Sequence, residues 1–163
     1  MESPRFFITL ALPDGRTWRV DDASDRWLVA THLSSRSMLW VRSWREGSVM
    51  SHGRCEAVAR RWRPDLLGAD ATTLVDRRPL GAPIGFDTEM GFAVYRAKSA
   101  LGGVVAAFGA HVRLCLVMAY ATRSEGPDAE RVLAERLAFI AERVFPRVRS
   151  RTIEDRVAPL GGR

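Results

Sequence analysis

Residues 112–120 read Val-Arg-Leu-Cys-Leu-Val-Met-Ala-Tyr, and this stretch decides the fold. Successive side chains of a β-strand point to opposite faces of a sheet. One face of this strand takes Val112, Leu114, Leu116, Met118 and Tyr120. The other face takes Arg113, Cys115, Val117 and Ala119, and it is also mostly apolar. A strand that is apolar on both faces lies inside a sheet that helices cover on both sides.

The chain before this stretch predicts four strands ahead of any helix. Pro13-Asp14-Gly15 is a turn signal, because proline fixes φ and glycine tolerates a positive φ. We therefore expect the strands on either side of it to form a hairpin. Three serines within residues 34–37 separate the next two strands. The four predicted strands are Phe6–Leu12, Thr17–Val20, Trp27–His32 and Met38–Trp44.

Two helices are predicted from apolar residues that recur three and four positions apart. Ser51 can cap the first helix, and Pro64 ends it. Pro127 suits the first position of the second helix, which Pro146 ends. Their apolar stripes are Cys55, Val58, Ala59 and Trp62 in the first, and Leu133, Leu137, Ile140 and Val144 in the second.

Between the helices we expect a short strand over Thr72–Arg78 and a hairpin of Phe86–Ala97 with Gly103–Phe108. A chain of 163 residues suits a single domain, 1–163. The predicted class is α+β, an antiparallel β-sheet flanked by helices as an α/β/α sandwich. We expect part of the tail, 148–163, to be disordered.

The order of these elements, and the opening Phe7-Ile8-Thr9-Leu10-Ala11-Leu12-Pro13-Asp14-Gly15, resemble the PsbP-like α/β/α sandwich. A photosystem subunit, Ran-binding nuclear import factors and bacterial secretion chaperones share that fold. The resemblance rests on order and pattern, and it transfers no functional residue. It implies a protein that acts by binding other proteins.

The basic residues are spread along the whole chain. There are 25 Lys+Arg against 19 Asp+Glu, which gives a formal net charge of +6, and Lys98 is the one lysine. A nucleic-acid binder concentrates its basic groups on one face, whereas these arginines alternate with acids. A nucleic-acid-associated protein is therefore the alternative function, supported by net charge alone.

Two cysteines, Cys55 and Cys115, are too few for a disulfide framework, and a reducing compartment follows by default. The apolar run before Pro13 is too short for a signal peptide, so we expect a cytoplasmic protein without a membrane span. A chain whose leader had been removed would look the same. In an exported form the two cysteines could form a disulfide.

We expect neither a metal nor a cofactor. His52 and Cys55 are one helical turn apart, but Cys55 belongs to the apolar stripe. His111 and Cys115 lie four apart in a predicted strand, about 13 Å, which is too far for one zinc ion. No phosphate-binding or hydrolase motif occurs, so a small hydrolase is the least favoured function. Asp87 and Glu89 share a strand face that we interpret as a solvated edge.

One strand face carries the candidate for partner binding. Trp40, Arg42 and Trp44 alternate with other residues and so point the same way. Tryptophans can stack on a guanidinium group, and protein interfaces are enriched in both residue types. Core packing of the tryptophans is the competing interpretation. The sequence thus favours a non-catalytic protein-binding module, an adaptor or chaperone-like domain.

Overall fold

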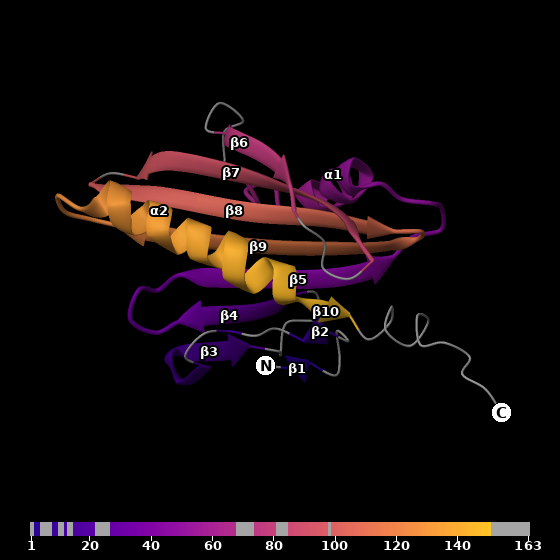
Figure 1. The fold of residues 1–163 in the computed structure, drawn as a ribbon, viewed down its shortest axis with the longest axis horizontal. Coiled ribbons are helices and arrows are strands. Elements are labelled where there is room, and N and C mark those ends of the chain that lie inside the picture. Colours follow the sequence, from indigo (N-terminus) through magenta and orange to yellow (C-terminus); the bar gives the residue numbers. More distant parts are fainter. Residues whose placement is uncertain are drawn as a thin grey trace.

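An antiparallel sheet of seven strands forms the middle of the protein (Figure 1). The computed structural model describes residues 2–3, 8–9, 12, 15–21, 27–67, 74–80, 85–97 and 99–150. Across the sheet, the strands are β3 (Trp18–Asp21), β4 (Leu28–His32), β5 (Met38–Arg45), β9 (Leu114–Ser124), β8 (Ala100–His111), β7 (Asp87–Ala97) and β6 (Leu74–Pro79).

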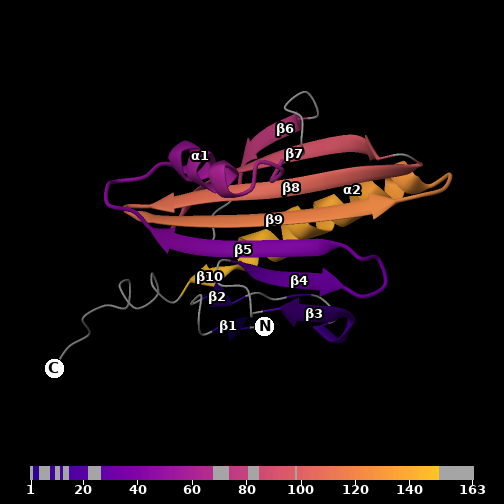
Figure 2. The same cartoon turned by 180° about the vertical axis from the view of Figure 1, so that it is seen from behind.

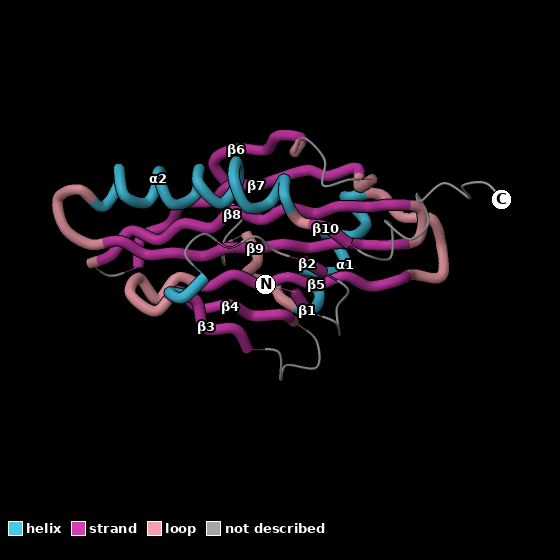
Figure 3. The backbone as a smooth tube through the Cα atoms, turned by 60° about the horizontal axis from the view of Figure 1, so that its bottom comes forward, coloured by secondary structure: helices cyan, strands magenta, loops and turns pink. Residues whose placement is uncertain are grey.

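The two helices lie on opposite faces of this sheet (Figures 1 and 2). The helix α1 (His52–Trp62) packs on β7, β8 and β9. The helix α2 (Ala129–Phe139) continues through a π-helical turn, η3 (Ile140–Val144), and a 3₁₀ turn, η4 (Phe145–Arg147), and packs on β8 and β9 (Figure 3). The predicted α+β class, an antiparallel sheet with helices on its faces, is confirmed. Within the described residues, neither helix is long and apolar enough to cross a membrane.

The second helix buries all of its predicted stripe, whereas the first buries only half of its own, since Val58 is partly exposed and Trp62 is 36% exposed. Ser51 caps α1 by accepting a hydrogen bond from the backbone N–H of Arg54, and its Cys55 and Ala59 are fully buried. The second helix begins two residues after Pro127. Leu133 and Leu137 of this helix are buried. With Ile140 and Ala141 of the π-helical turn, they belong to the same core cluster as the sheet residues Val105, Leu116 and Met118.

A second, small sheet corrects the predicted first hairpin. It consists of β1 (Glu2–Ser3), β2 (Ile8–Thr9) and β10 (Arg149–Ser150), with β2 between the other two. The strand β2 therefore pairs with β1 and with β10, which follows the second helix, and β3 pairs with β4. Gly15–Thr17 form a 3₁₀ turn, η1, and the other residues of the expected hairpin turn lie outside the described residues. The turn signal was local, whereas the partner of β2 is distant in the sequence.

The tail begins as a packed segment. Val148 is buried, and Arg149–Ser150 are the strand β10. Residues 151–163, where we expected disorder, lie outside the described residues.

The predicted strand over residues 112–120 starts too early. Val112 and Arg113 form the tight turn between β8 and β9, so His111 and Leu114 face each other across a hairpin. The alternating pattern runs through this turn without a glycine, asparagine or aspartate to mark it. His111 and Cys115 thus lie on neighbouring strands, and the argument from their separation along one strand was wrong.

Val112 has a φ of 52°, a left-handed conformation that is costly for a β-branched residue. Its side chain is 59% exposed, so it packs little. Val112→Gly should therefore raise the free energy of unfolding by about 1 kcal/mol, measured by urea denaturation. Arg113→Gly is the matched control, because Arg113 has no positive φ, and it should destabilise the domain. Equal effects of both changes would contradict the strain at Val112.

Candidate functional site

The helix α1 covers one end of its sheet face (Figure 2). A hollow lies beside the other end of this face. The hollow has a volume of about 1050 Å³. Its walls come from five places in the chain: the β4–β5 turn with the start of β5, the loop after α1, the end of β7, the first half of β8, and the end of β9. We call this hollow the groove.

The floor of the groove is apolar. It consists of Met38, Trp40, Leu66, Val104 and Ala121. Trp40, Leu66 and Val104 are buried, whereas Met38 and Ala121 are partly exposed. The β5–β9 pairing sets Met38 beside Ala121, and the β8–β9 pairing sets Ala121 beside Val104. Four of the five floor residues thus lie on three paired strands, and Leu66 comes from the loop after α1.

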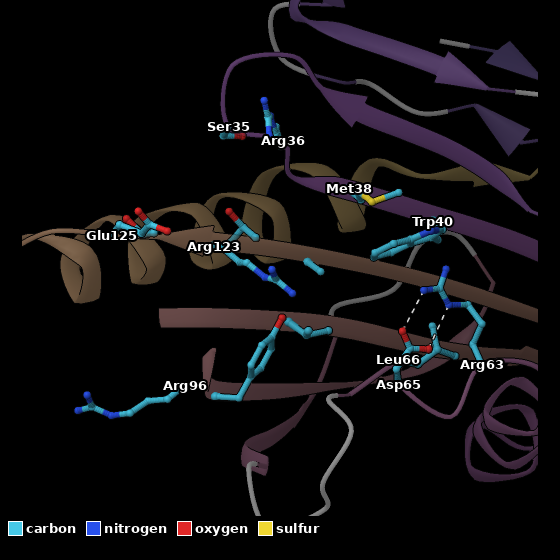
Figure 4. Close-up of a pocket in the computed structure, with 15 residues that line it drawn as sticks. Ser35, Arg36, Met38, Trp40, Arg63, Asp65, Leu66, Arg96, Arg123 and Glu125 are labelled. Atoms are coloured by element: carbon cyan, nitrogen blue, oxygen red, sulfur yellow. Dashed lines mark hydrogen bonds and ion pairs between the residues drawn. The ribbon is translucent and has the colours of Figure 1, made fainter. Parts of the chain in front are cut away.

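Arg63 closes one end of the groove. Its guanidinium carbon lies 4.3 Å from the centre of a ring of Trp40, and one of its nitrogens lies 3.0 Å from a carboxylate oxygen of Asp65 (Figure 4). The hydrogen bond from Arg63 lowers the pKa of Asp65, more than burial raises it. Asp65 therefore stays ionised and holds Arg63 over the indole.

Tyr95 forms the opposite side. Its ring lies directly against Gly102 of the neighbouring strand, where an added β-carbon would overlap the ring. Any larger residue at this position would force the Tyr95 ring to shift.

A chain of hydroxyl groups fixes the β4–β5 turn to β9. His32 Nδ1 lies 2.8 Å from the Ser35 hydroxyl, which lies 2.7 Å from that of Ser37. Ser37 in turn lies 2.7 Å from the buried Thr122 hydroxyl. A serine nucleophile needs a base that a third group orients, and among the described residues no carboxylate contacts His32. The contacts brace the turn that carries the groove wall.

The three residues of the predicted binding face have different contacts in the structure. Trp40 is 9% exposed, belongs to the core under α1 and also lines the groove. The Arg42 guanidinium stacks on Trp62 of α1, 3.7 Å from a ring centre. Trp44 packs edge-on against the same Trp62 and donates its Nε1–H to Glu46. The tryptophan that lies closest over Arg42 is therefore one from α1, and Arg42 and Trp44 hold that helix.

A disulfide between Cys55 and Cys115 ties α1 to β9, with Cα atoms 5.6 Å apart. The interpretation of Cys55 as a free apolar residue was wrong. The buried stripe of α1 meets the face of β9 that carries Cys115. The two cysteines are therefore close only because of how the helix packs on the sheet. Both sulfur atoms are bonded to each other, so neither is available for a thiol–imidazole pair with His52.

Charged residues fix the same helix. Glu56 of α1 contacts Arg60, at 2.9 Å, and Arg77 of β6, at 2.7 Å. Arg77 also contacts Glu89, and His52 Nδ1 lies 3.0 Å from Asp87 Oδ2. Asp87 and Glu89 do share one face, as predicted, but they are partners of α1 and of Arg77. The helix is therefore held by a covalent bond, a charge network and a stack of aromatic rings.

Glu56→Gln tests the charge network. Burial raises the pKa of Glu56, but hydrogen bonds and charges from Arg77 and Arg60 outweigh it and hold the pKa below its ordinary value. The carboxylate therefore stabilises the fold fully above the pKa of an unfolded glutamate, and this contribution is lost as the pH falls through the lower folded pKa. At pH 7, Glu56→Gln should cost about 2 kcal/mol in urea denaturation.

The cost of Glu56→Gln should shrink as the pH falls below about 4. Glu135→Gln is the control, since Glu135 forms an exposed pair with Arg131 and should cost only about 0.3 kcal/mol. A cost that does not change with pH would contradict the network.

No protein-family model matches this sequence, and no curated protein matches it. Two solved structures are similar. A crystal structure from Bacteroides thetaiotaomicron VPI-5482 has a TM-score of 0.54 at 6% identity, over 92% of this chain and 47% of that one. LpqN of Mycobacterium tuberculosis, involved in cell envelope biogenesis, has a TM-score of 0.44 at 15% identity, over 84% of this chain and 81% of its own.

The chain thus spans about half the length of the Bacteroides protein. At so low an identity the likeness shows the fold alone, an α+β sheet fold. The finer resemblance to the PsbP-like sandwich stays a prediction.

Proposed function

We propose that this protein is a non-catalytic binding module, an adaptor or chaperone-like domain, whose groove holds a segment of another protein. The observation that carries this proposal is the groove itself, an open hollow of about 1050 Å³ with an apolar floor. When a ligand displaces water from apolar side chains that line an open hollow, the free energy of the complex falls. Large apolar hollows with a polar rim mark binding sites for proteins and ligands.

The residue types in the groove support a protein ligand. Methionine, tryptophan, tyrosine and arginine are the residues that protein interfaces enrich, and Met38, Trp40, Tyr95 and Arg123 all line it. Met38 belongs to the floor, and its flexible thioether adapts to different apolar partners. Of the three residues that the sequence nominates, Trp40 lies in the floor, and Arg42 and Trp44 support the helix beside it.

The disulfide favours an oxidising compartment over the cytoplasmic default. Disulfides persist in compartments outside the reducing cytosol. The bond between Cys55 and Cys115 joins α1 to β9, which already pack against each other. We accordingly place the working form of this domain outside the cytosol. Intact mass measurement of the protein from its native compartment, with and without thiol labelling, tests this placement. Two labelled thiols before reduction would contradict it.

Selection from a phage-displayed library of short random peptides tests the proposed function. Ala121→Gln places a longer, uncharged side chain on the exposed floor and should block the groove. Ala57→Gln is the same change at an exposed site on α1, far from the floor. Peptides with adjacent apolar residues should bind the parent and Ala57→Gln alike, and Ala121→Gln roughly tenfold more weakly or worse. The proposal would be overturned if the selection enriched no peptide, or if the selected peptides bound the parent, Ala57→Gln and Ala121→Gln equally well.

A further inference from the structure

Among the residues that the structure describes, three arginines at the groove have no acidic partner. Arg36, Arg96 and Arg123 are exposed and line the groove. Within the described residues, no ion pair or hydrogen bond is made by their guanidinium groups. By contrast, Arg63 at one end of the groove and Arg60, Arg77 and Arg131 outside it each contact a carboxylate.

The three cations that line the groove come from different elements. Arg123 projects from β9 (Figure 4). Arg36 stands at the β4–β5 turn, and Arg96 lies near the end of β7. Charges of one sign around a hollow with low-dielectric walls concentrate ligands of the opposite sign. Glu125 and Asp65 are the acids that line the groove, and Asp65 is occupied by Arg63.

We infer that the occupant of the groove is an acidic segment of a partner protein, with carboxylates flanking a short apolar stretch. This inference rests on the proposed function. The apolar stretch would cover the floor, and aspartate or glutamate side chains would pair with Arg123 and with the two rim arginines. A guanidinium group donates two parallel hydrogen bonds to one carboxylate, which fixes the direction of the bound segment.

A single-stranded nucleic acid is the other anionic polymer, and the aromatic rings disfavour it. Bases bind to such grooves by stacking on free aromatic faces. The face of Trp40 carries Arg63, and the ring of Tyr95 lies against Gly102. The groove thus offers apolar edges and cations rather than open rings.

The triple variant Arg36→Gln/Arg96→Gln/Arg123→Gln tests the inference. Its matched control is Arg45→Gln/Arg61→Gln/Arg143→Gln, which removes the same charge from exposed sites that do not line the groove. Peptides selected on the parent should be rich in Asp and Glu beside apolar residues. They should bind the groove variant at least roughly tenfold more weakly, and the control within about twofold of the parent. Their affinity for the parent should also fall as salt rises.

Two results would overturn the inference, and they differ in what they leave standing. Apolar peptides without acids that bind the triple variant and the parent equally, but not Ala121→Gln, would overturn the acidic partner and keep the proposed function. Absence of any selected peptide, together with oligothymidylate binding that the triple variant loses, would overturn both in favour of nucleic acid.

Discussion

The double variant Cys55→Ser/Cys115→Ser is expected to unfold with a free energy about 4 kcal/mol below that of the parent. The disulfide joins residues 60 positions apart, and the unfolded chain gains most entropy when a loop of such length is released. The change also removes the covalent link between α1 and β9. Urea denaturation of both proteins measures the difference.

A reductant supplies the control for this prediction. The chain has 2 cysteines, so dithiothreitol should destabilise the parent and leave the double variant unchanged. Equal urea midpoints for the parent and the double variant would show that the bond does not hold α1 in place.

Trp40→Ala is expected to lower the free energy of unfolding by about 3 to 5 kcal/mol. The indole is 9% exposed and packs against Trp27, Ala59 and Leu66 under α1, so its removal leaves a cavity in the core. Thermal melts provide the measurement. Trp62→Ala removes an indole that is 36% exposed and should cost about half as much, mainly through its contacts with Arg42 and Trp44.

An unchanged melting temperature for Trp40→Ala would mean that the indole contributes little to the core. The binding face would then be the one that the sequence alone suggests, with Trp40, Arg42 and Trp44 all available to a partner. The structure favours the other outcome, in which Trp40 belongs both to the core and to the groove floor.

Local patterns in the sequence determine most of this fold. Residues 114–120 alternate between two apolar faces, and that pattern alone predicts a strand between two helical layers. The stripe of α2 is equally explicit, because Leu133, Leu137, Ile140 and Val144 are all buried. A strand or a helix of this kind is determined by residues that are neighbours in the sequence. It can therefore be predicted without knowing which distant segment packs against it.

The features that sequence reasoning missed depend on distant partners. The turn at Val112 and Arg113 is enforced by strand pairing, although valine opposes it. The Cys55–Cys115 bond arises where a helix crosses a strand 60 residues away in the sequence. In the groove, Arg123 is recognisable only as a basic residue that ends an apolar strand. Its neighbours Met38, Leu66 and Tyr95 come from three other segments.

The groove as the binding place is the central claim, and an amide-resolved NMR titration tests it most directly. A peptide obtained by selection on the parent protein would be added to isotope-labelled domain. The claim predicts that the largest amide shifts lie at Met38, Leu66, Ala121 and Arg123, and that Ala121→Gln abolishes them. Shifts that cluster on the opposite face, around the smaller hollow lined by Trp18, Tyr120 and Phe139, would contradict it.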